Sequence, residues 1–448
     1  MGNETSRYVA VIGAGPAGIF AARELANNNH KVTIINRDIK PGGLAEYGIY
    51  PTKQKIKEGL RKQFYSTLSF NSVSYFGNLV VGENADLSLQ DLRDIGFDAI
   101  LVTTGAQGTK WLGLPGEDLK GSYHAKDLVY HYNQLPPFSS TDFHIGKKVA
   151  IIGVGNVMLD IARYLITEKQ VEEVTAIARR GPAEVKFTRK ELEYIVKNLD
   201  MDDYLKEIER VTPLMKSLGQ DPSESIRFIR DAFPNAEETN SDTSFRIKFL
   251  ASPVRLIGNE NDEVAAIELE ENMLVLVHDT HQARGTGKTQ IVEVDTVIFA
   301  IGDTIDPEFG LPFDGNEFVK NPNPRFPING TSYESYDPEA QKIIEDVFLA
   351  GWARKASDGL VGNARKDGVN AAQVVDAYLK SLTTPPKENG HSIHMFLTKK
   401  HSTVVSKNDL QILLAEENKV AALKGIENFK FSTNEEMLSI ISQHEVSR

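Results

Sequence analysis

Cysteine is absent from this chain of 448 residues. Without thiols there can be no Cys-x-x-Cys disulfide reductase, no cysteine-sulfenate peroxidase and no thiolate-ligated iron–sulfur cluster. Any redox cofactor that this chain binds must therefore pass its electrons directly to an external acceptor.

Long hydrophobic runs and an excess of positive charge are also missing. No apolar stretch approaches the roughly 20 residues that span a bilayer, and the N-terminus shows no charged-then-apolar signal. We therefore expect a cytoplasmic protein with no membrane partner. The formal net charge of −12 argues against nonspecific nucleic-acid binding, because a polyanion requires a basic face. The length suggests two or three domains.

Two glycine-rich loops are the most informative pattern that is present. The first is Gly13-Ala14-Gly15-Pro16-Ala17-Gly18, and the second is Gly153-Val154-Gly155-Asn156-Val157-Met158. Each follows an apolar, strand-like run and precedes a helix-like stretch, which is the context that makes the pattern specific. The first glycine permits a tight turn, and the second lets backbone N–H groups approach a pyrophosphate at the helix N-terminus. The chain therefore predicts two dinucleotide sites.

The end of the second strand in each unit distinguishes the two cofactors. An acid normally stands there, about 20 residues beyond the glycines, and accepts the ribose hydroxyls. The first unit has Asn36, which can accept one uncharged hydrogen bond, followed by a loop arginine, Arg37. The second unit has no acid but the pair Arg179 and Arg180. Paired guanidinium groups bind a 2′-phosphate, so this unit is predicted to prefer NADP over NAD.

The order of segments predicts an α/β fold of two Rossmann-like dinucleotide-binding domains, the second inserted into a discontinuous first. Further buried strands are expected at residues 31–35, 98–105, 174–178, 245–250 and 296–302, with a return to the first domain at 347–352. Helices are expected near residues 190–218, 368–382 and 410–423.

Short motifs spread over nearly the whole chain resemble the adrenodoxin reductase type of ferredoxin–NADP reductase. Besides the two glycine loops, they are Gly43-Leu44, Tyr47-Gly48-Ile49, Thr104-Gly105-Ala106, residues 114–119, Tyr132-Asn133, residues 178–182 and 187–192, Ser252-Pro253-Val254, Ala350-Gly351-Trp352 and residues 359–362. The glutamate synthase small subunit is related, but it carries an iron–sulfur domain that a chain without cysteine cannot form.

The resemblance implies where the two cofactors are held. It assigns residues 1–108 and 304–448, with a C-terminal helical extension, to an FAD domain, and residues 109–303 to an NADP domain. The FAD contacts it implies are Ala17, Asn36, Leu44, Val81, Trp352, Gly359, Leu360 and Val361. The NADP contacts it implies are Val154, Gly155, Asn156, Val157, Arg179, Arg180, Glu191 and Gly359.

Departures from the family pattern fall near the flavin. Residues 356–358 read Ala-Ser-Asp where Gly-Pro-Thr is common, and residues 51–53 read Pro-Thr-Lys where the family has Pro-Asp-His. Met158 replaces the third glycine or alanine of the second loop, which implies slightly wider helix–strand packing. These changes leave fold and cofactors in place but put the flavin potential in question.

The implied function is a flavoprotein oxidoreductase that moves a hydride from NADPH to FAD and then single electrons to an acidic ferredoxin or flavodoxin. Hydride transfer between stacked rings needs no acid or base, so no catalytic side chain and no metal site are expected. Positive charge for docking is expected from Lys53, Lys55, Lys57, Arg61, Lys62, Arg189, Lys190, Arg354 and Lys355, although residues 53–62 fit a solvated helix face equally well.

Two alternatives remain from the sequence. One is an electron-input subunit of a larger oxidoreductase complex, which copurification distinguishes. The other is a redox-sensing dinucleotide-binding protein without turnover, which NADPH oxidation with an artificial acceptor distinguishes.

Overall fold

The computed structural model describes the chain except for residues 1–5, 279, 357–358, 388–395, 397–402 and 447–448. The chain forms two compact units. Unit 1 comprises Met1–Thr109, Tyr130–Ser140 and Gly302–Arg448, and unit 2 comprises Lys110–Val129 and Thr141–Ile301.

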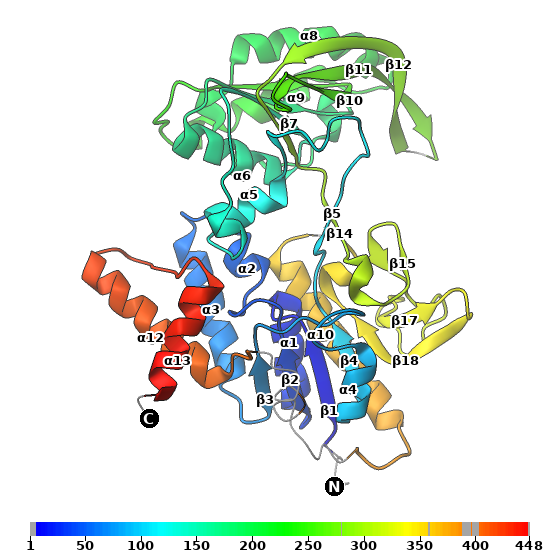
Figure 1. The fold of residues 1–448 in the computed structure, drawn as a ribbon. Helices are drawn as coiled ribbons and strands as arrows, with labels where there is room; N and C mark the ends of the chain where they lie inside the picture. Colours follow the sequence, from blue (N-terminus) through cyan, green and yellow to red (C-terminus); the bar gives the residue numbers. More distant parts are fainter. Residues whose placement is uncertain (1–5, 279, 357–358, 388–395, 397–402, 447–448) are drawn as a thin grey trace. The chain divides into compact units, whose positions relative to one another are not determined.

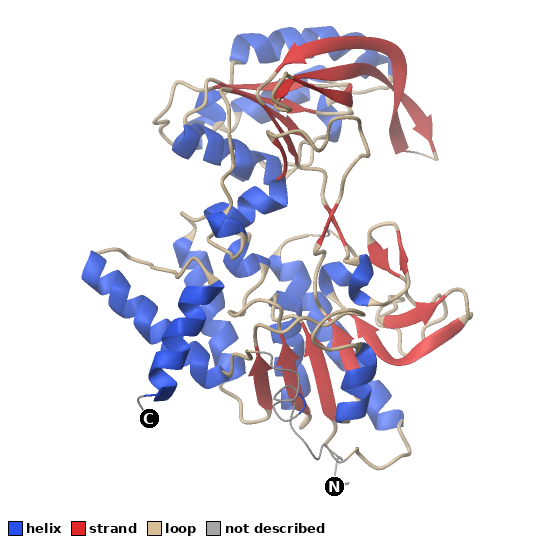
Figure 2. Cartoon of the chain, in the orientation of Figure 1, coloured by secondary structure: helices blue, strands red, loops and turns tan. Residues whose placement is uncertain are grey.

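Unit 1 is built on a six-stranded sheet in the order β17-β18-β4-β1-β2-β3 (Figures 1 and 2). The strands are β1 (Tyr8–Ile12), β2 (Lys31–Ile35), β3 (Val73–Phe76), β4 (Ala99–Val102), β17 (Glu334–Asp337) and β18 (Lys342–Leu349). All neighbours are parallel except β17 and β18, which are antiparallel. The order reverses between β1 and β4, and ligands of such sheets bind beyond the carboxyl ends of the strands at this point.

Both faces of this sheet are buried because its strands alternate apolar side chains between two clusters. Val9 and Val11 face a cluster that includes α1, α3 and α10, whereas Ala10 and Ile12 face a second cluster that includes α4. The helices of unit 1 are α1 (Pro16–Asn27), α2 (Leu44–Tyr47), α3 (Gln54–Leu68), α4 (Leu89–Ile95), α10 (Val361–Ser381), α12 (Lys407–Lys424) and α13 (Asn434–Val446). The short strands β5 (Gly108–Thr109) and β14 (Asp303–Thr304) pair with each other, as do β15 (Phe313–Asp314) and β16 (Glu317–Phe318).

Unit 2 repeats this plan with a parallel sheet in the order β6-β13-β7-β8-β9. Its strands are β6 (Ser122–His124), β7 (Lys148–Ile152), β8 (Glu173–Ile177), β9 (Ser244–Lys248) and β13 (Thr296–Phe299). A separate antiparallel sheet of β10 (Ala251–Gly258), β11 (Val264–Val277) and β12 (Thr280–Glu293) shares a hydrophobic cluster with it. The helices are α6 (Asn156–Tyr164), α7 (Arg189–Leu192), α8 (Met201–Ser217) and α9 (Pro222–Arg230), while α5 (Ala125–Tyr132) spans the division between the units.

The fold class predicted from the sequence is confirmed: both units are Rossmann-like, and unit 2 is inserted into unit 1. Several details differ. Residues 130–140, which the predicted boundaries gave to the second domain, group with unit 1. The single helix expected over 190–218 is divided into α7, a short 3-10 turn and α8, and α10 begins at Val361 rather than near residue 368. The antiparallel sheet and α13 were not predicted.

Candidate functional site: two open glycine loops

The three glycines of the first loop serve different purposes. Gly13 has φ +106°, and a Cβ there would lie 2.6 Å from the Thr103 carbonyl oxygen; a Cβ on Gly18 would lie 2.0 Å from the Gly13 carbonyl oxygen. These two glycines are required by the packing of the protein itself. A Cβ on Gly15 would meet nothing within 4 Å. The space beside Gly15 is therefore open, as a cofactor pyrophosphate requires.

The helix that begins at this open point is suited to an anion. Gly15 is the N-cap of α1, no side chain caps the helix, and its first turn contains no acid. The first backbone N–H groups of a helix lack partners within the helix and favour negative charge. Gly15 and α1 therefore fit the pyrophosphate of a dinucleotide in unit 1.

The loop before α2 lies against the same glycines. The Gly42 N–H donates to the Ala14 carbonyl oxygen at 2.8 Å. Gly43 has φ +49°, and a Cβ there would lie 3.2 Å from the Cα of Gly15. Leu44, the first residue of α2, follows directly on this contact with the first glycine loop; its contact with FAD stays a prediction.

Asn36 holds this loop together. Its Oδ1 accepts the Ala14 N–H at 2.9 Å, and its Nδ2 donates to the carbonyl oxygens of Asp38 (2.8 Å) and Lys40 (3.1 Å). The side chain is 7% exposed. In this structure the amide shapes the glycine loop, and a direct contact with the ribose stays a prediction.

The segment that carries the predicted FAD residue Trp352, together with α10, contacts α1 at Ala17. A Cβ on Gly351 would lie 2.9 Å from the Cβ of Ala17, and a Cβ on Gly368 would lie 2.1 Å from the Ala17 carbonyl oxygen. Trp352 follows in a one-turn 3-10 helix, and the Gly351 N–H donates to Asp367 Oδ2 at 2.7 Å. The structure therefore brings Ala17, Trp352 and α10 together, and Asp367 is a member that the sequence did not reveal.

The start of α10 is also open. Leu360, its N-cap, is 72% exposed, no side chain caps the helix, and its first turn has no acid. Gly359 has φ +76°, which explains glycine at this position. In the segment 356–358, where the sequence departs from the family pattern, Ser357 and Asp358 lie outside the described residues. Val81, by contrast, is 8% exposed and belongs to the hydrophobic cluster of Ile12 and Leu87, so only its backbone is available to a cofactor.

The second glycine loop has the same division of roles. Gly153 has φ +123°, and a Cβ there would lie 2.3 Å from the Ala300 carbonyl oxygen, whereas a Cβ on Gly155 would meet nothing within 4 Å. Gly155 is the N-cap of α6, which has neither a side-chain cap nor an acid in its first turn. Met158, in place of the third glycine, is completely buried. Unit 2 thus offers a second open pyrophosphate cradle.

The neighbouring loop of residues 186–188 is fastened to this cradle. The Lys186 N–H donates to the Val154 carbonyl oxygen at 3.0 Å, and the Thr188 N–H donates to Asn156 Oδ1 at 2.8 Å. Thr188 in turn caps α7, which carries Glu191. Val157 is 44% exposed. Val154, Asn156 and the helix of Glu191 are therefore assembled in one place.

Arg179 and Arg180 follow β8, and their guanidinium groups make no hydrogen bond or ion pair within the described part of the chain. Their backbone, however, is held firmly. The buried Asn272 donates from Nδ2 to the Arg179 carbonyl oxygen at 2.9 Å, and the Leu250 N–H donates to the Arg180 carbonyl oxygen at 3.2 Å. A fixed backbone with free guanidinium groups suits the recognition of a phosphate.

Part of the predicted docking surface is wrong, because three of its cations are used inside unit 1. Lys57 is 2% exposed and donates to Asn133 Oδ1 at 2.5 Å. Arg61 binds both carboxylate oxygens of Glu46 at 2.6 Å. Arg354 binds Asp367 at 2.6 and 3.1 Å. A charge neutralised inside the fold contributes little to the attraction of a partner.

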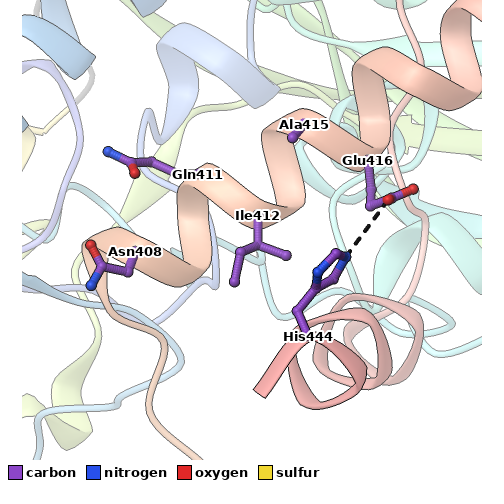
Figure 3. A pocket seen from close by; sticks show the side chains of 6 residues that line it. All are labelled: Asn408, Gln411, Ile412, Ala415, Glu416 and His444. Atoms are coloured by element: carbon purple, nitrogen blue, oxygen red, sulfur yellow. Dashed lines mark ion pairs between the residues drawn. The ribbon is translucent and has the colours of Figure 1, made fainter. Parts of the chain in front are cut away.

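The groove between α12 and α13 is separate from these residues (Figure 3). It is lined by Asn408, Gln411, Ile412, Ala415, Glu416 and His444, and a 3.6 Å ion pair joins Glu416 to His444. None of the predicted site residues lines it. Among the described residues, no helix is long and apolar enough to cross a membrane. No group of His, Asp or Glu in the same part of the chain is arranged to hold a metal.

Comparison with known proteins shows which proteins this chain resembles. The family model described as pyridine nucleotide-disulphide oxidoreductase matches residues 7–202. The chain is 28% identical to the NADPH-ferredoxin reductase FprA of Mycobacterium tuberculosis, over 97% of this chain and 98% of the relative. It is 26% identical to the mitochondrial NADPH:adrenodoxin oxidoreductase of Bos taurus, over 98% and 92% respectively.

A solved structure is also similar to this chain. The structure of Mycobacterium tuberculosis FprA in complex with NADPH matches with a TM-score of 0.79 and 26% identity, covering 97% of this chain and 99% of that chain. The fold has two dinucleotide-type glycine loops, and the similar proteins define its class as an NADP-dependent flavoprotein oxidoreductase. Within that class, the predicted resemblance to the adrenodoxin reductase type of ferredoxin–NADP reductase is confirmed.

Proposed function

We propose that this protein is an FAD-containing, NADPH-dependent reductase that passes electrons to a small ferredoxin-type carrier. The observation that carries the proposal is the pair of glycine loops, each open at its second glycine. Only the second loop is followed, at the end of the next strand, by an arginine pair whose guanidinium groups have no partner within the described residues. FAD and NADP as cofactors, and an NADP-dependent flavoprotein oxidoreductase as enzyme class, agree with relatives that match over nearly the whole chain.

Unit 1 is the FAD domain and unit 2 the NADP domain in this proposal. When bound, FAD takes up a hydride from NADPH and supplies single electrons. The residues of the chain bind the two cofactors and orient them. Gly15 and Gly155 leave room for the two pyrophosphates, and the N-termini of α1 and α6 attract their charge. Arg179 and Arg180 bind the 2′-phosphate, while the backbone of residues 359–361 and Trp352 border the flavin.

The carrier is a small acidic protein, a ferredoxin or a flavodoxin. Within the described residues, Lys55 and Lys62 on α3 and Lys366 on α10 are exposed and make no ion pair. Arg365 connects the two helices, because its guanidinium donates to Gln63 at 3.4 Å. The helix α10 thus contributes to the surface that carries these lysines. Its N-cap residue, Leu360, is exposed at the predicted flavin site. Complementary charge at this place would raise the rate of carrier association.

The arginine pair provides the test. Each charge-assisted contact to the 2′-phosphate is worth about 1.5 to 3 kcal/mol. With R179Q/R180Q, the preference for NADPH over NADH in reduction of ferricyanide should therefore shrink by about one to four orders of magnitude. FAD content should not change. Equal losses with both nucleotides would show that the pair has a structural role and would remove the main support for an NADP site.

We further propose that the protein works in the cytoplasm without binding nucleic acid or membranes. The charge and hydropathy of the chain support this proposal. Some relatives carry "mitochondrial" in their names, so cell fractionation is the appropriate test.

A further inference from the structure

The C-terminal segment, residues 403–446, packs on the side of unit 1 that contains α3 (Figure 1). Leu410 and Leu413 of α12 and Met437 and Ile441 of α13 are buried in the same hydrophobic cluster as α1 and α3. Lys407 Nζ donates to the carbonyl oxygens of Phe70 and Val73 at the start of β3. The segment is therefore part of the fold of the proposed FAD domain.

This segment brings a largely buried lysine, whose side chain is 13% exposed, to the carboxylate of Glu46 on α2. Lys430 Nζ lies 2.5 Å from Glu46 Oε1, 3.3 Å from the Asn133 carbonyl oxygen and 4.9 Å from the centre of the Tyr47 ring. Glu46 is 4% exposed and also receives both bonds from Arg61. A carboxylate on α2 is thus held by two cations, one from α3 and one from the C-terminal segment.

The protonation of these groups agrees with the geometry. Burial alone would raise the pKa of Glu46, but the hydrogen bond from Arg61 and the charge of Lys430 outweigh burial and hold that pKa well below its usual range. Burial lowers the pKa of Lys430, and the charge of Glu46 opposes this change. Removing Lys430 leaves Glu46 paired with Arg61 alone and frees the C-terminal segment from α2, and weakening a buried ion-pair network in this way is costly.

The helix α2, which these ion pairs hold in place, is too short to be stable alone. α2 comprises only Leu44–Tyr47, and a single helical turn has no stability of its own. Just before it, Gly42 is bonded to Ala14 and Gly43 lies against Gly15. The position of α2 therefore fixes one wall of the first glycine loop.

We propose that Lys430 is a positioning residue for FAD: through Glu46 it ties the C-terminal segment to α2 and so holds the Gly42-Gly43-Leu44 loop against the first glycine loop. The inference rests on the proposed function in one respect only, the assignment of FAD to unit 1. Lys430 does not touch the cofactor and acts by setting the shape of its site.

The experiment measures the dissociation constant of FAD for the full-length apoprotein by quenching of flavin fluorescence. The variants are K430Q, the conservative K430R, and the control K419Q, which removes an exposed ion pair with Glu416 on the same segment. Loss of a group that orients a binding site typically costs about 10- to 100-fold in affinity at metal sites, and we expect a loss of about this size for K430Q. K430R should recover most of it, and K419Q should match the parent. Thermal unfolding of each apoprotein is measured in parallel.

The outcomes separate the two proposals. Weaker FAD binding by K430Q, with an apoprotein that still unfolds cooperatively and with NADP binding unchanged, supports the positioning role. If K430Q lowers the apoprotein melting temperature but keeps the parental FAD affinity, the lysine only stabilises the fold and the inference is overturned. If K430Q does not fold, the part of the FAD affinity that K430R does not recover decides: weaker FAD binding by K430R than by K419Q supports the positioning role, and equal binding by the two variants overturns it. A parent protein that binds no FAD overturns the proposed function itself.

Discussion

Lys57 gives the sharpest test of the structure, because a basic residue on a helix rich in lysine turns out to be buried. The residue is 2% exposed, and its ammonium group has Asn133 Oδ1 as its hydrogen-bond acceptor at 2.5 Å. The pKa of Lys57 is lowered from 10.5 to about 7, chiefly because of burial; the charges of Lys430 and Arg61 add to this lowering, and the charge of Glu46 opposes it. We predict that this one side chain makes stability depend on pH in the alkaline range.

The sign follows from the protons bound in each state. Between pH 7 and 10.5 the unfolded chain keeps Lys57 protonated while the folded protein releases the proton. Stability therefore rises with pH through this window, by up to about 1.4 kcal/mol per pH unit for one full proton. Above the window lysine is neutral in both states, and below it the full cost of a buried ammonium remains. Between pH 7.5 and 9 we expect a gain of about 1 to 2 kcal/mol from Lys57.

The assay compares the parent holoprotein with K57M in urea titrations at several pH values, followed by flavin fluorescence. K57M removes the hydrogen bond from Lys57 to Asn133 Oδ1, a cost of about 1 to 3 kcal/mol that does not vary with pH. The informative quantity is therefore the difference in slope. K55M, at an exposed position of the same helix, should keep the parental slope. Parallel pH profiles for the parent and K57M would refute the argument.

Three further predictions follow from the cofactor sites and the docking surface. Gly15→Val should fold normally, because a Cβ atom there meets nothing within 4 Å, but it should lose FAD on gel filtration, whereas Gly155→Val should keep FAD and raise the KM for NADPH; retention of full flavin by the first variant would disprove the site. Asn272→Leu should reduce the preference for NADPH over NADH about tenfold with FAD content unchanged, since it frees the backbone of Arg179 at the cost of about one hydrogen bond; an unaltered preference would exclude a positioning role. Replacing the free docking lysines by glutamine should slow reduction of a ferredoxin below about 0.1 M salt, where charges act over about 10 Å, and should leave ferricyanide reduction intact; unchanged ferredoxin rates would move the docking surface elsewhere. The lysines in question are Lys55, Lys62 and Lys366.

Local patterns allowed the central parts of this structure to be predicted from the sequence. Each glycine loop has its strand and helix as immediate neighbours, so the loop, its open second glycine and the arginine pair after β8 were recognisable without tertiary information. The α12 helix was recognisable for the same reason, because its apolar spacing is helical. The assignment of individual contacts to FAD and NADP stays a prediction.

Features that depend on distant partners could not be predicted. The partner of Lys57 is Asn133, and the partner of Glu46 comes from the C-terminal segment. The long strand β12 is mostly exposed and polar, so it shows no alternation that would indicate a strand. Asn272 stands at an irregularity of the β11–β12 pairing, which no sequence pattern marks.

The basic residues of this acidic protein divide into two groups by their partners, and this division decides which of them can recognise another molecule. Lys57, Arg61, Arg354 and Lys430 are held by groups of the protein itself. Their removal should alter stability or the shape of a site. The guanidinium groups of Arg179 and Arg180 have no partner within the described residues. An unpaired guanidinium needs no internal bond to be broken before it binds a phosphate, so its full charge-assisted interaction is available to the ligand. The same reasoning favours the free lysines of α3 and α10 over Lys57, Arg61 and Arg354 as the place where a carrier docks.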